Sequence, residues 1–172
     1  MLYMVEMEFR NPAREADWHA WYFDHVARLI RTVPGFRASQ RFRAITATPS
    51  PWLAMHDVVS GEVFESSEYR ANGGRASTGE WQHEHTNWYR NLFAGIDYTP
   101  EVPLDAHLLV CDAGASLPPS HAPGVTWLES AGLDRSAERR GIAVVPAGRL
   151  TATLFGLAGV RIFRPISPRI AA

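Results

Sequence analysis

The chain has 172 residues, 46% of them hydrophobic and 20% charged, which is the composition of a folded globular protein with one domain or two small ones. Its formal net charge of −1 excludes a broad electrostatic attraction to nucleic acid or to an acidic membrane surface. The single cysteine, Cys111, excludes an internal disulfide and a multi-cysteine metal site, and its apolar neighbours predict a buried side chain. No signal-peptide pattern and no run of ~20 apolar residues is present, so we expect a cytoplasmic protein.

Three strands are predicted in the first half, over residues 2–9, 36–45 and 52–60, because apolar and polar side chains alternate there. Alternation does not decide which face of the third strand points to the helices. The predicted faces are Tyr3, Val5, Met7 and Phe9 in the first strand, Phe36, Ala38, Gln40, Phe42 and Ala44 in the second, and Trp52, Ala54, His56 and Val58 in the third.

A long amphipathic helix is predicted between the first two strands. Asn11 and Pro12 form a typical helix start, and the helix ends at Val33 because Pro34 and Gly35 follow. Its buried face carries a central histidine among aromatic and aliphatic side chains: Trp18, Trp21, Tyr22, His25, Val26 and Leu29. Such a face is either plain core or the wall of a ligand pocket.

Further elements complete the first half of the chain. Residues 61–68 predict a short helix, residues 80–93 a second long helix, and residues 96–102 a short fourth strand. The second long helix again places a histidine among large apolar side chains, in the stripe Trp81, His85, Trp88 and Leu92.

The second half predicts four more strands, over residues 106–113, 124–133, 141–145 and 160–166, and a short helix over residues 151–157. Short motifs of the first half recur there. Leu92-Phe93-Ala94-Gly95 is echoed by Leu154-Phe155-Gly156, and Gly35-Phe36 by Gly124-Val125. We interpret the chain as a degenerate tandem repeat whose second copy has lost most of its first helix to the loop 114–123.

The element order β-α-β-β-α-β predicts an α+β fold of the ferredoxin-like type. We expect two units, residues 1–103 with two long helices and residues 104–172 as a second, shortened ferredoxin-like repeat packed against the first. Together they would form an antiparallel sheet or an α/β barrel.

Motifs in the first hundred residues resemble the dimeric α/β-barrel superfamily. They are Trp18, Trp21-Tyr22 and Asp24-His25, then Val33-Pro34-Gly35-Phe36 and Arg41-Phe42-Arg43, followed by the stretches 52–57 and 62–69. The pattern is most similar to EthD-like and uncharacterised members with the motif W-Y-x-x-H…PGF…R-F-R. It departs from them at His56, where a tyrosine is common, and in the shortened second half. We therefore expect either a monomer with an internal pseudo-dimer or a homodimer.

The resemblance implies a fold more firmly than a chemistry, because fold alone is a weak guide to function. Relatives of this fold include muconolactone-type isomerases, cofactor-free oxygenases that act on polyketides, haem proteins and proteins without a known activity.

The candidate catalytic residues are His25, His85, His56 and Tyr22. A histidine with an ordinary pKa of ~6.5 transfers protons at neutral pH, and a tyrosine hydroxyl can donate a hydrogen bond to a carbonyl or phenolate. The candidate substrate-binding residues form flat apolar walls and a clamp for a carboxylate: Trp18, Trp21, Trp81, Trp88 and Arg41. The alternatives are an aromatic core for the histidines and tryptophans, and an ion pair with Glu6 or Glu8 for Arg41.

The sequence predicts no metal and no cofactor. His83-Glu84-His85 contains possible metal ligands, but alternate residues of a helix point in diverging directions and the i, i+4 spacing of a helical zinc pair is absent. No dinucleotide or phosphate loop and no nucleophile elbow is present. Haem, with His85 as its axial ligand, is the remaining cofactor hypothesis.

These patterns favour a small cofactor-independent enzyme of isomerase or lyase type, which isomerises, eliminates from or cyclises an aromatic, polyketide or lactone-type molecule by histidine acid/base chemistry. One alternative is a cofactor-free monooxygenase of the same fold, in which tryptophan and tyrosine hold a reactive phenolate beside oxygen. Another is a non-enzymatic small-ligand-binding or accessory protein whose histidines are core. The expected partner is a small aromatic molecule, with neither nucleic acid nor membrane.

Overall fold

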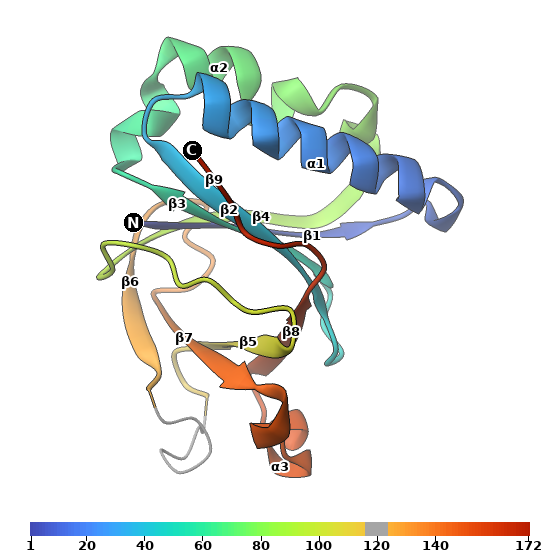
Figure 1. The fold of residues 1–172 in the computed structure, drawn as a ribbon, viewed down its shortest axis with the longest axis vertical. Coiled ribbons are helices and arrows are strands. Elements are labelled where there is room, and N and C mark those ends of the chain that lie inside the picture. Colours follow the sequence, from blue (N-terminus) through green and yellow to red (C-terminus); the bar gives the residue numbers. More distant parts are fainter. Residues whose placement is uncertain (116–123) are drawn as a thin grey trace.

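The computed structural model describes residues 1–115 and 124–172, and these form an α+β fold built on a closed antiparallel barrel of eight strands (Figure 1). A short ninth strand, β9, extends the sheet beside β2. The strands are β1 (Leu2–Phe9), β2 (Phe36–Ala44), β3 (Trp52–Val58), β4 (His85–Ala94), β5 (Ala106–Asp112), β6 (Thr126–Leu133), β7 (Arg139–Pro146), β8 (Val160–Pro165) and β9 (Ile170–Ala171).

The barrel follows the strand order β3-β1-β4-β6-β7-β5-β8-β2, and the β2–β3 pairing closes it. Strands β1–β4 lie side by side in one half of the barrel, and β5–β8 lie side by side in the other. Each half has the same internal order: its second, third, first and fourth strands are neighbours. The barrel is therefore closed within a single chain.

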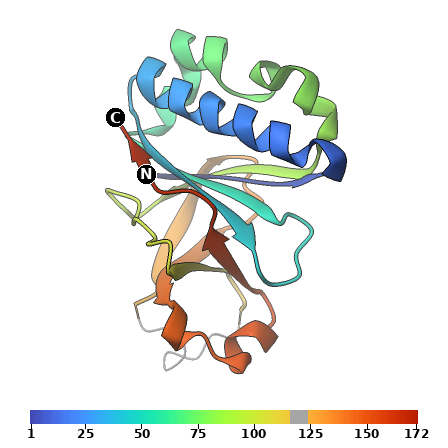
Figure 2. The ribbon, with the colours of Figure 1, turned by 45° about the vertical axis from the view of Figure 1, so that its right-hand side comes forward.

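The helices cover the two halves unequally. One group consists of α1 (Glu15–Thr32), α2 (Ser67–Asn72) and the 3-10 segments Pro12–Arg14, Gly61–Glu65 and Arg75–Glu84. Figure 2 shows this group on one side of the barrel, whereas α3 (Ala152–Gly156) lies at the opposite end with the 3-10 turn Ala147–Arg149. In the described residues, the layer between α1 and the first half of the barrel is therefore the larger of the two layers outside the barrel.

The turn from α1 into β2 requires its glycine. Val33 leaves the helical region with φ −107° and ψ 106°, as expected for a residue before proline. Gly35 then adopts φ +89°, and a Cβ there would lie 2.6 Å from a methyl carbon of Val59 and 2.7 Å from one of Val63. The predicted end of the helix is confirmed.

Buried apolar side chains form three layers. The first lies between α1 and the outer faces of β1, β3 and β4, and includes Tyr3, Val5, Trp18 and Tyr22. The second fills the barrel, and the third lies under α3 and includes Cys111, which is buried as predicted. The outward face of β3 that carries Trp52, Ala54 and Val58 is the face under the helices.

A network of four charged side chains extends from the barrel interior, where Glu6 and Arg140 are buried, to the partly exposed Arg161 and Asp112 at the end of the barrel. Arg140 is 2% exposed, and its Nη1 donates to Glu6 Oε2 at 2.6 Å while its Nε donates to Asp112 Oδ1 at 2.6 Å. Arg161 pairs with the same two carboxylates. Glu6 is therefore neutralised by these two arginines, and the alternative that paired it with Arg41 is wrong.

The predicted second long helix is wrong, as is the short strand at residues 96–102. Residues Arg75–Glu84 form 3-10 turns, and β4 follows from His85. Opposite β1, Glu6 pairs with Tyr89 and Glu8 with Thr86, so β4 contains a bulge, and Asn87 there has φ +43°. The extra residue places His85 and Trp88 on one face at a spacing of three, which imitates helical periodicity.

A second irregularity changes the predicted face of β2. The register shifts between Phe36 and Ala38, so Phe36 packs under the helices whereas Phe42 points into the barrel. The other predicted elements of the second half correspond to β5–β8 and α3. Most of the predicted loop 114–123 lies outside the described residues, and the division at residue 103 into two repeats stays a prediction.

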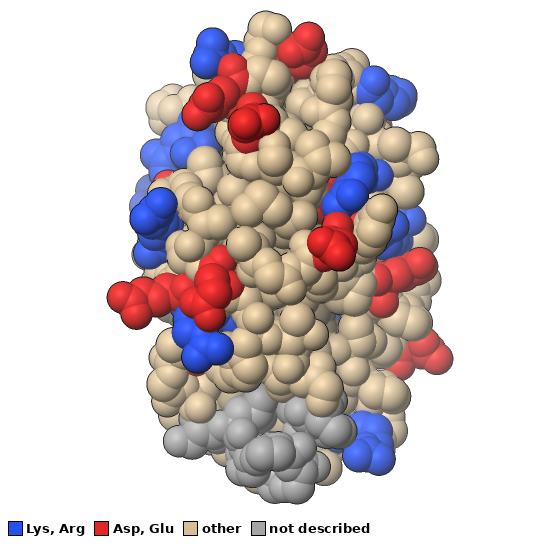
Figure 3. Space-filling model, turned by 90° about the vertical axis from the view of Figure 1, so that its left-hand side faces the viewer, with Lys and Arg blue, Asp and Glu red and all other residues tan. Residues whose placement is uncertain are grey.

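The described surface offers no continuous region of one charge on the face in Figure 3, where acidic and basic side chains are interspersed. In the described residues, no helix combines the length and the apolar character needed to cross a bilayer.

Candidate functional site

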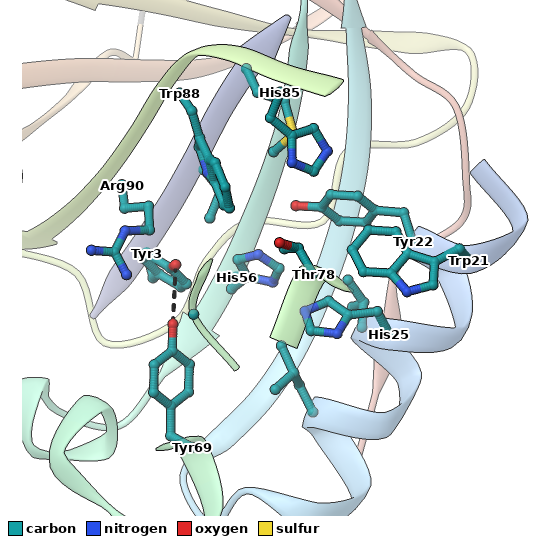
Figure 4. A pocket seen from close by; sticks show the side chains of 15 residues that line it. Tyr3, Trp21, Tyr22, His25, His56, Tyr69, Thr78, His85, Trp88 and Arg90 are labelled. Carbon is teal, nitrogen blue, oxygen red and sulfur yellow. Dashed lines mark hydrogen bonds between the residues drawn. The ribbon is translucent and has the colours of Figure 1, made fainter. Parts of the chain in front are cut away.

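A cavity lies between α1 and the outer face of β1, β3 and β4, and is closed at the side by α2 and the segment Arg75–Glu84 (Figure 4). Six of the nine predicted site residues line it: Trp21, Tyr22, His25, His56, His85 and Trp88. Figure 4 shows the three histidine rings and the Tyr22 hydroxyl around one space. The sheet supplies His56 and His85, and the helix supplies His25, so three separate elements bring the histidines together.

Three predicted site residues do not line the cavity. Trp18 is fully buried behind it and stacks on Phe9 with ring centroids 4.5 Å apart. Trp81 is also buried and has the Arg14 guanidinium 4.1 Å from its ring centroid. Arg41 lies on the other side of α1, where it contributes to a separate surface hollow.

His85 is oriented by a hydrogen bond from Trp18. The indole Nε1–H donates to His85 Nε2 at 2.8 Å, so the neutral ring must carry its proton on Nδ1. That Nδ1 is buried without a partner among the described residues. Burial and the Arg41 charge lower the pKa of His85 to about 4. At neutral pH this residue therefore offers an unused N–H donor.

His25 is fixed in the opposite way. Arg28 Nη2 donates to His25 Nδ1 at 3.2 Å, since a guanidinium cannot accept, and this leaves the proton of the neutral ring on Nε2. The ring stacks on Trp21 at 12° between planes. Burial first, and then the nearby Arg28 and His85, lower the pKa of His25 to about 4.

His56 is the most deeply buried of the three histidines, with 2% of its surface exposed. Its ring stacks on Tyr3 with centroids 5.1 Å apart, and its Nδ1 has no hydrogen-bond partner in the described part of the chain. Burial is the main cause that lowers the pKa of His56 to about 3. No contact fixes its tautomer, so either nitrogen is available to accept a proton.

Sequence reasoning missed four polar residues of the cavity: Tyr3, Tyr69, Thr78 and Arg90. The hydroxyls of Tyr3 and Tyr69 lie 3.4 Å apart, and burial raises the pKa of Tyr3 well above its ordinary value. Burial also raises the pKa of Tyr22 to about 12. The signal for Tyr3 was present, because it shares the predicted face of β1 with Val5 and Met7, which line the cavity as well.

The cavity is narrow in this structure. Its volume is about 30 Å³, which is room for roughly one or two water molecules. Trp21 and Trp88 are the partly exposed tryptophans of the lining, and the Trp88 Nε1 is buried without a partner among the described residues. An aromatic ligand would enter only if these two side chains or the segment Arg75–Glu84 moved outward.

The chemistry of the cavity is that of a hydrogen-bonding pocket with aromatic walls. Its histidines are neutral at pH 7, and it contains no carboxylate. Among the described residues, no group of three His, Cys, Asp or Glu side chains is placed to hold a metal ion. Unpaired nitrogens can hold a polar group of a ligand, and the aromatic rings can hold its flat apolar part.

Comparison with known proteins gives structural matches. No family model matches the sequence, and no curated protein matches it. A "putative monooxygenase" from Lactobacillus acidophilus matches with a TM-score of 0.56 at 7% identity, over 99% of this chain and 98% of the other. An "anthrone oxidase-like protein" matches with a TM-score of 0.54 at 11% identity, over 99% of this chain and 92% of the other.

These likenesses cover nearly the whole chain at very low sequence identity, so they establish the fold alone. The expected α/β barrel is consistent with them. The chain is therefore an α+β protein with a closed antiparallel barrel, similar in fold to these two proteins.

Proposed function

We propose that the protein is a small cofactor-independent oxygenase that oxidises a phenolic polycyclic compound, such as an anthrone, with molecular oxygen. The observation that carries the proposal is the arrangement of three neutral histidines around an aromatic cavity, two of which, His56 and His85, have a buried Nδ1 without a partner among the described residues. The names of the two structural neighbours point in the same direction. Of the functions considered from the sequence, this is the monooxygenase alternative.

Each of the three histidines has a role in this proposal. His56, which has a free ring nitrogen, accepts a proton from the acidic CH₂ or hydroxyl of the substrate. The Nδ1–H of His85 and the Nε2–H of His25 donate hydrogen bonds to the oxygen on which negative charge develops. The aromatic walls exclude water, which strengthens these interactions.

The electron-rich anion formed in this way can reduce oxygen directly. For an anthrone, the overall reaction converts the ring CH₂ and one O₂ into a ring C=O and one H₂O. The carbon loses four electrons, O₂ gains them, and the two protons leave in the water. The proton that His56 accepts is one of these two, so the residue returns to its neutral state.

The lowered pKa values disfavour an isomerase or lyase mechanism in which two histidines exchange a proton. Two-histidine proton shuttling at pH 7 requires one cationic ring and one neutral ring. Here the pKa values of His25 and His85 are about 4 and that of His56 is about 3, so no ring is a ready general acid. Oxygenation needs only a base and neutral donors, and the anion it creates stabilises the newly formed imidazolium.

The test is oxygen uptake with anthrone, measured against an enzyme-free blank because anthrones also oxidise spontaneously. We expect quinone formation with one O₂ consumed per substrate and one label from ¹⁸O₂ in the new carbonyl. His56→Phe should lower the rate by about 100-fold or more, as is typical for loss of a general base. His83→Gln, which changes an exposed histidine outside the cavity, is the matched control.

Other results would select the rival functions. Substrate conversion without oxygen uptake, lost in His25→Gln, would support the isomerase or lyase hypothesis. Tight binding of aromatic ligands without turnover would support a ligand-binding or accessory protein.

We also propose that residues 1–103 and 104–172 are degenerate repeats that form an internal pseudo-dimer. The equal strand order in the two halves of the barrel supports this. The partner would be a small aromatic molecule, and relatedness to EthD-like proteins remains part of the proposal. Light scattering at low micromolar concentration should give the mass of a monomer, whereas a tight dimer would contradict it.

A further inference from the structure

A second hollow lies on the opposite side of α1 from the cavity. It is bounded by α1, the ends of β2 and β3, and the segment that follows β8, and its volume is about 310 Å³. This is at the lower end of the range of small-molecule sites, ~300–1,000 Å³. Its lining is Glu15, His19, Phe23, Arg41, Arg43, Trp52, Arg164, Ile166 and Ser167.

Arg41 is a buried cation without a counter-charge in this hollow. It is 6% exposed, and its Nη2 and Nη1 donate to the Nδ1 and the backbone oxygen of His19 at 3.1 and 3.4 Å. Its guanidinium lies 4.1 Å from the ring centroid of Tyr22. Burial lowers the pKa of Arg41 to about 10, which reflects the cost of a desolvated charge. A buried charge of this kind is usually paired.

Arg43 and Arg164 add two further cations at the rim. They are directly opposite each other on β2 and β8, an arrangement of like charges that destabilises a sheet. Neither has a carboxylate within salt-bridge distance among the described residues, and the undescribed residues 116–123 contain no carboxylate at all. Three arginines therefore line one hollow, and none of them forms a salt bridge with a carboxylate among the described residues.

The other charged groups of the hollow do not neutralise the arginines. Glu15 Oε1 lies 3.7 Å from His19 Nε2 and makes no arginine contact. Burial, followed by the charges of Arg41 and Arg43, lowers the pKa of His19 to about 4, so this histidine is neutral at pH 7. The formal charge of the lining is thus positive. Phe23, which is 45% exposed, and Trp52 supply an apolar wall beside it.

We propose that this hollow binds a small organic anion, whose carboxylate or phosphate group is held by Arg41, Arg43 and Arg164 and whose aromatic or apolar part rests on Phe23 and Trp52. Arg41 is held in place by His19 and Tyr22 before the ligand arrives, so little side-chain order has to be created on binding. The arginine forks match planar or tetrahedral oxyanions.

The site is distinct from the cavity but adjoins it. Tyr22 lines the cavity, and the Arg41 guanidinium of the hollow packs against the Tyr22 ring. The proposal does not depend on oxygenase activity, because it concerns binding alone and is measured without turnover.

The test is calorimetric titration of the intact protein with benzoate, phenyl phosphate and neutral benzamide. We expect the two anions to bind, benzamide to fail, and affinity to fall as salt is raised. Tighter binding of phenyl phosphate would assign the site to phosphorylated compounds, and tighter binding of benzoate to carboxylates. The Arg43→Gln/Arg164→Gln double variant should lose at least about tenfold in affinity, which is ~1.4 kcal/mol.

Two controls protect this test. Both substituted arginines are exposed, so the double variant should keep its melting temperature, and the Arg10→Gln/Arg149→Gln double variant removes the same two charges from exposed positions outside the hollow. Equal affinity in these two double variants would overturn the proposal. So would the absence of anion binding up to about 10 mM, or binding that is lost only in His25→Gln, which would place the anion in the cavity.

Discussion

The barrel interior and the cavity under α1 both contain buried ionisable side chains, but these side chains are paired differently in the two places. Inside the barrel, Arg140 and Arg161 bind Glu6 and Asp112, and each charge has a partner from this chain. Under α1, buried nitrogens of His56, His85 and Trp88 have no partner in the described residues.

We interpret the paired charges of the barrel as groups that stabilise the fold, and the unpaired nitrogens under α1 as groups that bind a ligand. An unpaired buried donor or acceptor costs about 1–3 kcal/mol, so a cluster of them is an unfavourable feature of the free protein. A ligand that pairs these groups recovers that cost, whereas the barrel network gains nothing from a ligand. The comparison predicts that changes in the barrel alter stability and that changes in the cavity alter function.

The largest expected effect is on stability in mild acid. The pKa values of about 4 for His25 and His85 and about 3 for His56 lie below the ordinary value of 6.5. Between pH 6.5 and 4 the unfolded chain binds protons that the folded chain does not, so the free energy of unfolding falls as the pH is lowered through this window. We expect a loss of several kcal/mol in sum, measured by urea unfolding at pH 7.5, 6 and 5.

Proton-sensitive NMR of the histidine rings provides an independent check of the same quantity. If the cavity histidines titrated near pH 6.5 in the folded protein, the assignment of a neutral, desolvated pocket would be wrong.

A smaller but still large effect is expected from Arg140→Ala. This change leaves Glu6 and Asp112 with Arg161 alone in the barrel interior, and breaking such a buried pair costs about 3–5 kcal/mol. Arg139→Ala is the matched control, because its side chain is 51% exposed and pairs with the exposed Glu129. That variant should lose less than about 1 kcal/mol in urea unfolding. An equal loss of the free energy of unfolding in both variants would mean that the buried network stabilises the fold no more than an exposed ion pair does.

An intermediate effect is expected from Asn87→Val. The φ of +43° at Asn87 is unfavourable for a β-branched residue, so we expect a loss of about 1–2 kcal/mol and weaker ligand binding as His85 shifts. Asn87→Gly accepts this backbone conformation and should lose less, although it forfeits the side-chain bonds to Glu8 and Pro49. Thermal melting of both variants measures the difference.

Three strands and the long helix of the first half, and most of the cavity, were predictable from local patterns. Alternation identified β1 and β3 and grouped the side chains that share a face, without deciding which face of β3 lies under the helices, and the helical stripe of α1 placed Tyr22 and His25 on its buried face. His85 and Trp88 were also predicted, but on a helix rather than a strand. The bulge at Asn87 gives a strand the spacing of a helix, and no local propensity reveals it.

The remaining features depend on contacts between distant parts of the chain. Arg41 was expected beside the histidines, but its place on β2 puts it on the far side of α1, beside Arg43 and Arg164. Glu6 was considered as its partner, whereas Arg140 and Arg161 reach Glu6 from more than 130 residues away. Alternation gives the face of a strand, but only barrel closure decides which charges meet.

The smallest expected effect on stability belongs to His56→Phe. Phenylalanine has a similar shape and no unpaired nitrogen, so replacing His56 removes an uncompensated polar group and leaves the stacking on Tyr3. The free energy of unfolding should stay within about 1 kcal/mol of wild type at pH 7.5, and its decline toward pH 5 should be shallower, because one fewer histidine is buried neutral. A large loss of stability would mean that His56 is an ordinary core residue. Unchanged stability together with loss of oxidation would mean that His56 serves the reaction and does not stabilise the fold.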